Sequence, residues 1–250
     1  MPTYFREFLV AGLCSFLLLA TASCSETAEW AAKLRAARGA VASREFARAA
    51  KLLDEVIAIS ASEPEPFYLR GRERLRAGQF AAAVEDFDRY IELQPAAGPR
   101  LWERGIACYY AGQYAAGAEQ FSAYQTFDGN DVENAVWHLL CRTKLDGIAA
   151  ARRSALRVKQ DRRVPMSEID RMFRGQLSAT DVLHAAETCP EPQRNAAQFY
   201  AHLYLGIYLD ATGEPDDARV HLRQAVDKYP IDHYMWDIAR VHLRELEKSQ

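Results

Sequence analysis

Small and aromatic residues recur at a fixed interval through the middle of the chain. Between residues 67 and 124, one pattern is written twice with a spacing of 34 residues. A fixed period of this length predicts a solenoid of helix pairs, because each pair buries its apolar face only by stacking on its neighbours. We therefore expect an all-α fold built from helical hairpins. The matched pairs are Gly71 and Gly105, Gly78 and Gly112, Phe80 and Tyr114, Phe87 and Phe121, and Tyr90 and Tyr124.

Two of the predicted repeats are regular. Repeat two runs from about Pro64 to Pro95, and repeat three from about Gly98 to Phe127. Gly71 has no Cβ, so the facing helix can approach it closely. Gly78 is expected to close the first helix of its pair as a left-handed cap.

The pattern is looser on both sides of these repeats. Phe46, Ala49 and Leu53 precede their counterparts in repeat two by 34 residues, which predicts a first repeat with a degenerate opening helix. A fourth repeat has diverged. Its second helix, expected over Ile148–Lys159, carries Arg152 where a small residue belongs.

Residues 160–192 interrupt the repeats. Ser167 and Ser178 each begin a capping-box-like sequence, which predicts two short helices in this insert. Repeat phase then returns, and residues 231–247 are expected to form a final helix that caps the stack. The predicted layout is a signal peptide at 1–23, about four N-terminal repeats over 24–159 with the first and fourth degenerate, a non-repeat helical insert over 160–192, and a C-terminal repeat with a capping helix over 193–250.

The first 24 residues have the features of a targeting segment. Phe8–Ala20 is an uncharged apolar run with the length of a secretory signal's hydrophobic region, whereas spanning a bilayer takes about 20 residues. Small residues then lead to Cys24, as in the lipobox of bacterial lipoproteins, although Thr21 stands where leucine is usual. We expect lipidation of Cys24. Ordinary cleavage after Ala22, which releases a soluble secreted or periplasmic protein, is the alternative.

Composition and charge are those of a folded soluble domain. Hydrophobic residues make up 49% of the chain and charged residues 26%. The net charge of −3 gives no global positive field, so nucleic acid is not an expected partner. Cys108 and Cys141 are expected to be small buried residues. Neighbouring helices pack about 8–10 Å apart, whereas the Cα atoms of a disulfide lie within about 7 Å of each other.

The sequence contains no motif that carries catalysis. We find no GxSxG, HExxH, Walker or GxGxxG pattern, and the six histidines lack the spacing of metal ligands. The adjacent acids Asp216 and Asp217 fall in the first turn of a helix, where they complement its dipole. We therefore expect a protein that is not an enzyme and that uses neither a cofactor nor a metal.

The repeats resemble tetratricopeptide repeats. The residues that carry the likeness are Gly71, Ala83, Phe87 and Pro95 in repeat two and Gly105, Gly112, Tyr114 and Phe121 in repeat three. The resemblance implies a concave groove that binds other proteins. Aromatic and arginine side chains dominate the corresponding positions here, which is the composition of interface hot spots. Packing of Trp102 and Trp137 between helices is the alternative. The groove positions are Tyr68, Arg72, Arg76, Trp102, Ile106, Tyr109, Tyr110 and Trp137.

The order of the parts resembles one family more closely. Arg104–Tyr114, Ile169–Leu183 and Phe199–Ala218 look like segments of the NlpI family of tetratricopeptide-repeat lipoproteins from bacterial envelopes, and the insert is the specific part. Members of that family are homodimeric outer-membrane lipoproteins that face the periplasm. The resemblance implies a non-catalytic adaptor or scaffold for peptidoglycan hydrolases and a processing protease. A structural or assembly subunit of an outer-membrane or secretion complex is the alternative.

A basic tract lies between the fourth repeat and the insert. Six arginines and lysines fall within residues 152–163, against one acid, Asp161. This tract is a candidate docking patch for an anionic partner or for lipid headgroups, and a solvated helix face is the alternative. The patch candidates are Arg152, Arg153, Arg157 and Lys159.

Overall fold

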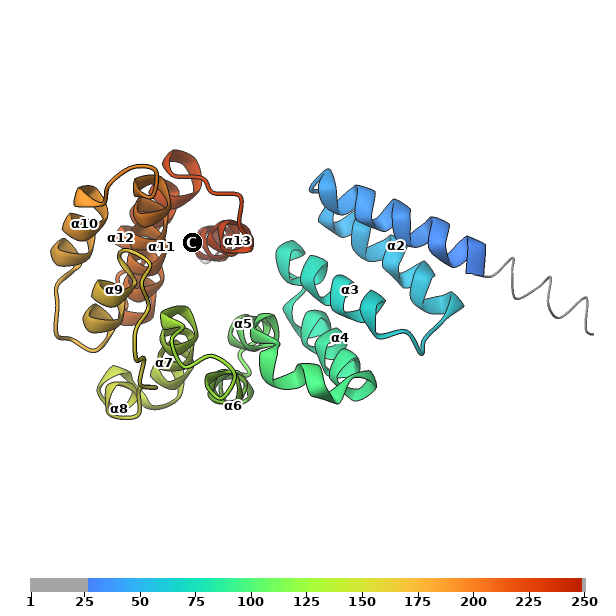
Figure 1. The fold of residues 1–250 in the computed structure, drawn as a ribbon, viewed down its shortest axis with the longest axis horizontal. Helices are drawn as coiled ribbons and strands as arrows, with labels where there is room; N and C mark the ends of the chain where they lie inside the picture. The colour runs from blue at the N-terminus through green and yellow to red at the C-terminus, as the bar shows by residue number, and fades with distance from the viewer. Residues whose placement is uncertain (1–26, 249–250) are drawn as a thin grey trace, which may run out of the picture.

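A computed structural model describes residues 27–248, and every regular element in that part of the chain is helical (Figure 1). Residues 27–42 form the first of these helices. The elements that follow are α2 (Phe46–Ile59), α3 (Pro64–Ala77), α4 (Phe80–Leu93), the 3-10 turn η1 (Pro95–Arg100), α5 (Trp102–Tyr110), α6 (Tyr114–Gln125), α7 (Val132–Asp146), α8 (Ile148–Arg153), α9 (Met166–Phe173), α10 (Ala179–Thr188), α11 (Arg194–Thr212), α12 (Pro215–Arg223), the π-helical turn η2 (Gln224–Lys228) and α13 (Tyr234–Lys248).

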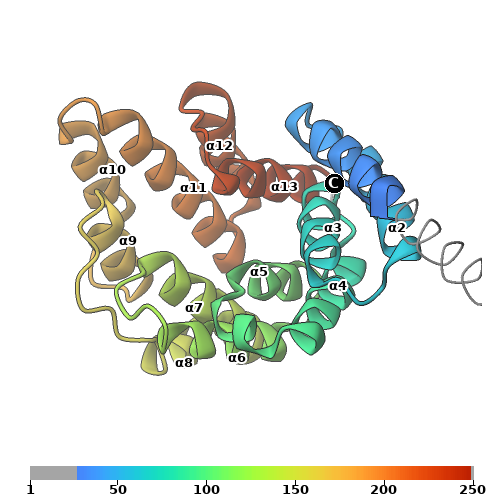
Figure 2. The same ribbon diagram turned by 45° about the vertical axis from the view of Figure 1, so that its right-hand side comes forward.

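The helices pack as consecutive hairpins. Helix α3 packs on α4, α5 on α6, α7 on α8, and α11 on α12. Figures 1 and 2 show these hairpins following one another along a curve, with α9 and α10 placed between α8 and α11. This arrangement confirms the predicted all-α helical-hairpin solenoid with a non-repeat helical insert.

The repeated glycines explain how the two helices of a hairpin meet. A Cβ on Gly71 would lie 2.8 Å from the Phe87 ring, and one on Gly105 would lie 2.5 Å from the Phe121 ring. Each buried phenylalanine therefore rests directly on the backbone of the facing helix. Gly78 adopts φ 84° and closes α3, which confirms the predicted left-handed cap.

The region around the insert differs in part from expectation. Helix α8 ends at Arg153, so the predicted helix over Ile148–Lys159 is wrong beyond that point. Ser178 does cap α10, and Asp181 completes the capping box. Ser167 instead lies inside α9, which begins at Met166 without a side-chain cap. The Val164–Pro165 peptide bond before α9 is cis.

The C-terminal helix does not lie as a cap at the end of the stack. Helix α13 packs on α12 and also reaches α3, more than 150 residues earlier in the chain. In both ribbon views it occupies the space between α3 and the α11–α12 hairpin. It buries Tyr234, Ile238 and His242, so this helix belongs to the core.

Candidate functional site

Side chains of the predicted groove contact the beginning of α13. The Tyr234 hydroxyl donates a hydrogen bond to the Arg72 carbonyl over 3.2 Å. The Tyr234 ring meets the Trp102 ring edge to face at 5.5 Å, and the Arg72 guanidinium lies 4.4 Å from its centre. Tyr234 is 7% exposed. An aromatic side chain of the same chain therefore fills the position where a partner's side chain was expected.

The middle of α13 is held by charge. Asp237, which is 5% exposed, accepts a hydrogen bond from Arg44 and pairs with Arg76, whose Nε lies 2.9 Å from its carboxylate. The Arg244 guanidinium donates to the Arg76 carbonyl at 3.3 Å. This carbonyl belongs to the last turn of α3, where a cation is favoured by the helix dipole. The charges thus tie α13 to the N-terminal repeats.

Polar contacts of His242 hold the second half of α13. His242 is 3% exposed, and its Nδ1 lies 2.9 Å from the Tyr110 hydroxyl. Its Nε2 lies 3.2 Å from a carboxylate oxygen of Asp210. The three residues come from α13, α5 and α11, so these contacts join three elements that are far apart in sequence.

These contacts correct the expectation of an open groove. Ile106, Tyr109 and Trp137 are 0%, 5% and 1% exposed, and they lie in the core. Trp137 therefore packs between helices, which was the alternative to exposure in the groove. Half-buried groove residues comprise Tyr68, Arg72, Arg76, Trp102 and Tyr110. Contact of the eight predicted groove residues with a partner protein stays a prediction.

A hollow lies along the inner side of the stack, beside the predicted groove residues. It has a volume of about 200 Å³, and we call it the inner pocket. Its apolar wall includes three of the predicted groove residues, and the start of α13 provides two further lining residues. The apolar lining consists of Trp102, Ile106, Phe121, Trp137 and Met235, and the polar lining of Asp131, Glu133, Asn134, Arg163 and His233.

Acidic groups outnumber basic ones on the polar side of the inner pocket. Arg163 pairs with Asp131 at 3.1 Å, with Glu133 at 2.5 Å and with Asp161 at 2.6 Å. Glu133 also accepts a 2.6 Å hydrogen bond from the Tyr204 hydroxyl. Burial, together with the nearby charge of Glu133, raises the pKa of Asp131 to about 6. One guanidinium thus serves three carboxylates.

The charged lining of the inner pocket was not among the predicted site residues. Asp131 lies in a turn sequence and is the N-cap of α7, where it accepts a hydrogen bond from the Glu133 amide. Arg163 lies about 30 residues later, in the irregular segment between α8 and α9. No spacing in the sequence relates them, because the folding back of residues 154–165 alone brings them together.

The basic tract is only partly available as a docking patch. Arg152 is a structural residue, because its guanidinium donates to the Phe173 carbonyl at 2.9 Å and to the Tyr208 hydroxyl at 3.1 Å. Its inclusion in the patch was wrong. Arg153, Arg157 and Lys159 are exposed, and no carboxylate among residues 27–248 pairs with them. These three form the exposed basic patch.

The structure describes Cys108 and Cys141, but it does not describe Cys24. Cys108 and Cys141 are buried free thiols, as expected from the helix spacing. Cys24 and the signal peptide at 1–23 lie outside the described residues. In the described part of the chain, no helix is both long and apolar enough to cross a bilayer.

Stacked hairpins with a glycine beneath each packed aromatic ring define a helical-repeat scaffold. Residues 68–132 match the tetratricopeptide repeat family, and this match spans repeats two and three. The described residues thus form an all-α solenoid of helical hairpins with tetratricopeptide repeats over residues 68–132, and these repeats support a role in binding other proteins as an adaptor or scaffold. A search of curated proteins found no match to the chain.

Proposed function

We propose that the protein is a non-catalytic adaptor of the bacterial cell envelope that binds a partner protein at the inner pocket. The observation that supports binding of a partner protein is the inner pocket. It brings Trp102 and its apolar neighbours together with an unbalanced acidic rim in the repeat family that serves protein interaction. Aromatic anchors in a partly enclosed pocket are the usual centre of a protein interface.

The envelope part of the proposal rests on the sequence resemblance. A lipid on Cys24 would hold the chain on the periplasmic face of the outer membrane, since acyl chains contribute about 0.8 kcal/mol per buried CH₂. By the same resemblance, the partners are peptidoglycan hydrolases and a processing protease, and the adaptor works as a homodimer. Acyl labelling of the wild type and of Cys24→Ala tests the anchor. An unlabelled wild-type chain would mean a soluble secreted protein.

A pull-down from envelope extracts tests the choice of partner. Wild type is expected to recover cell-wall hydrolases or a protease, and Trp102→Ala is expected to recover several-fold less because the pocket loses its aromatic wall. Lys51→Gln, a change on the exposed face of α2, serves as the matched control. Recovery of only secretion or barrel-assembly subunits would instead favour a structural subunit of such a complex.

A further inference from the structure

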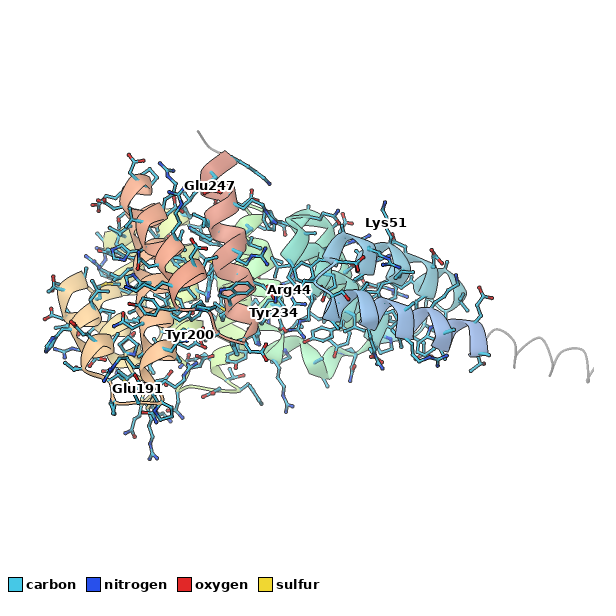
Figure 3. All side chains as sticks on the ribbon, turned by 90° about the horizontal axis from the view of Figure 1, so that it is seen from above. Arg44, Lys51, Glu191, Tyr200, Tyr234 and Glu247 are labelled. Carbon is cyan, nitrogen blue, oxygen red and sulfur yellow. The ribbon has the colours of Figure 1, made fainter. Side chains whose placement is uncertain are left out.

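Arginines gather where α13 meets the turn before α2. A second cavity, of about 320 Å³, opens there, and we call it the arginine cleft. Figure 3 shows Arg44 close to Tyr234, where the first helices approach α13. The cleft contains four guanidinium groups and one carboxylate. Its lining consists of Arg44, Phe46, Arg76, Asp237, Arg240, Val241 and Arg244.

The arginine groups that line the cleft outnumber the carboxylates that line it. Asp237 is shared by Arg44 and Arg76. From outside the lining, Glu73 pairs with Arg76 at 2.7 Å and Glu245 pairs with Arg244 at 3.5 Å. Arg240 is exposed, and within residues 27–248 no carboxylate pairs with it. Like charges this close repel one another, so a cavity with this lining attracts anions.

Aromatic rings help to position three of these guanidinium groups, in addition to the carboxylates that hold Arg44 and Arg76. Arg44 and Arg240 lie 4.5 Å and 4.9 Å from the centre of the Trp236 ring. Arg76 lies 5.1 Å from the centre of the Phe46 ring. A cation–π contact uses the flat face of a guanidinium, whereas its N–H donors point outward in the plane. The Trp236 ring therefore positions Arg240, which has no carboxylate partner among residues 27–248, and leaves its donor edge for the oxygens of a ligand.

The backbone of Arg44 adds a second sign of a built site. Its φ of 59° is left-handed, and among the described residues no other non-glycine residue has a positive φ. A side chain in this conformation costs conformational energy that glycine would avoid. The arginine at this turn donates to Asp237 and lines the cleft, so its side chain offsets the cost.

We propose that the arginine cleft binds an acidic peptide segment of a partner protein through the carboxylates of that segment. Asp237 already shows that a carboxylate fits between two of these guanidinium groups, whose forked donors match its geometry. Arg240 and Arg244 follow on the same helix, about 6 Å apart along its axis. Alternate side chains of an extended peptide repeat at about 6.6 Å, so a carboxylate on Arg240 places the next one near Arg244, whose guanidinium already donates to the Arg76 carbonyl. This site is separate from the inner pocket.

Fluorescence anisotropy with a labelled hexaglutamate peptide tests the proposal on the full chain. We expect binding at low salt that weakens as salt rises, and no binding of a hexaglutamine peptide. Arg240→Gln is expected to weaken hexaglutamate binding by about tenfold or more, the usual effect of losing one charge-assisted contact. Its melting temperature should stay near that of the wild type, because Arg240 is exposed. Arg171→Gln, a change at an exposed arginine of α9 outside both the cleft and the exposed basic patch, is the matched control and should bind like the wild type.

Three results would overturn the proposal. Equal binding of hexaglutamate and hexaglutamine would show that carboxylates are not recognised. An equal loss in Arg171→Gln and Arg240→Gln would show that only net charge matters. Displacement by millimolar inorganic phosphate, at constant ionic strength, would assign the cleft to phosphate. Trp102→Ala separates the two sites, because it should retain hexaglutamate binding even where it abolishes recovery of a partner at the inner pocket.

Discussion

At the scale of single residues, the hairpins depend on glycines that have no room for a methyl group. In Gly105→Ala the new Cβ would lie 2.5 Å from Phe121, a side chain that is 1% exposed. Since the ring cannot move into solvent, we expect the free energy of unfolding to fall by about 1–3 kcal/mol, the usual cost of overpacking. Urea unfolding followed by circular dichroism measures this change.

Gly39→Ala is the matched control for this substitution. Gly39 also lies within a helix, but no atom lies within 4 Å of its added Cβ. Alanine there should raise the free energy of unfolding by about 0.5–1 kcal/mol. If both variants were destabilised alike, the close approach of Phe121 to Gly105 would not be the cause.

Buried histidines predict a loss of stability in acid. Burial first, and then the charge of Arg142, lowers the pKa of His138 from 6.5 to about 4. Between these two values the unfolded chain binds a proton that the folded chain does not, so the free energy of unfolding falls with falling pH by about 1.4 kcal/mol per unit for such a group. Above pH 6.5 both states are neutral and this loss vanishes.

The prediction is tested by the slope of stability against pH. His138→Gln carries no titrating proton, so its free energy of unfolding should fall less steeply than that of the wild type between pH 6.5 and 4.5. Asp131, whose pKa is raised to about 6, acts in the opposite direction in both proteins and cancels in the comparison. Identical slopes would mean that His138 takes up its proton in the folded state as readily as in the unfolded state.

At the scale of elements, the position of α13 depends on its charged anchor. Asp237 is buried and serves both Arg44 and Arg76. We expect Asp237→Asn to lower the free energy of unfolding by about 2 kcal/mol, less than for a fully buried pair because the Arg44 side chain is 44% exposed. Hydrogen exchange of the α13 amides should accelerate before that of α5.

Asp232→Asn provides the control for this substitution, because Asp232 is exposed just before α13 begins. It should leave both the stability and the exchange of α13 near the wild-type values. Unchanged exchange in Asp237→Asn would show instead that Tyr234 and His242 hold α13 without the anchor.

The same elements show how far the sequence could predict the structure. The hairpins are predictable because a 34-residue period is a local pattern, repeated with glycines and aromatic residues at matching places. The return of α13 is a different case. The hydrogen bond from Tyr234 to Arg72 joins residues 162 positions apart, and no periodic signal relates them. The position of α13 against the predicted groove residues was therefore not foreseen from the sequence.

Arg152 illustrates a second limit on prediction. Its position in a run of basic residues indicated a charged surface. Because α8 ends at Arg153, the chain turns back and α9 is brought against α8. The Arg152 guanidinium then donates a hydrogen bond to the Phe173 carbonyl at the end of α9. Carbonyls at a helix end have no partner within their own helix, so the role of Arg152 is to satisfy this one.

At the scale of the whole molecule, the exposed basic patch can contribute to where the protein sits. Arg153, Arg157 and Lys159 have no acidic partner in the described residues, so their charge is available to an anionic surface. Each basic side chain near such a surface contributes about 1 kcal/mol, an attraction that fades beyond about 8 Å at physiological salt.

Sedimentation with vesicles tests this role of the exposed basic patch. Using vesicles of one part phosphatidylglycerol to three parts phosphatidylcholine, we expect Arg153→Glu combined with Arg157→Glu to lower binding by at least tenfold at low salt, since about 2 kcal/mol of attraction is lost. The difference should shrink as salt rises, and it should be absent with pure phosphatidylcholine. Lys51→Glu combined with Arg35→Glu, which reverses the same number of exposed charges on α2 and the first helix, is the control for net charge (Figure 3 shows Lys51). Vesicle binding that is equal in the double variant and the wild type, at every salt concentration, would leave the patch a solvated surface.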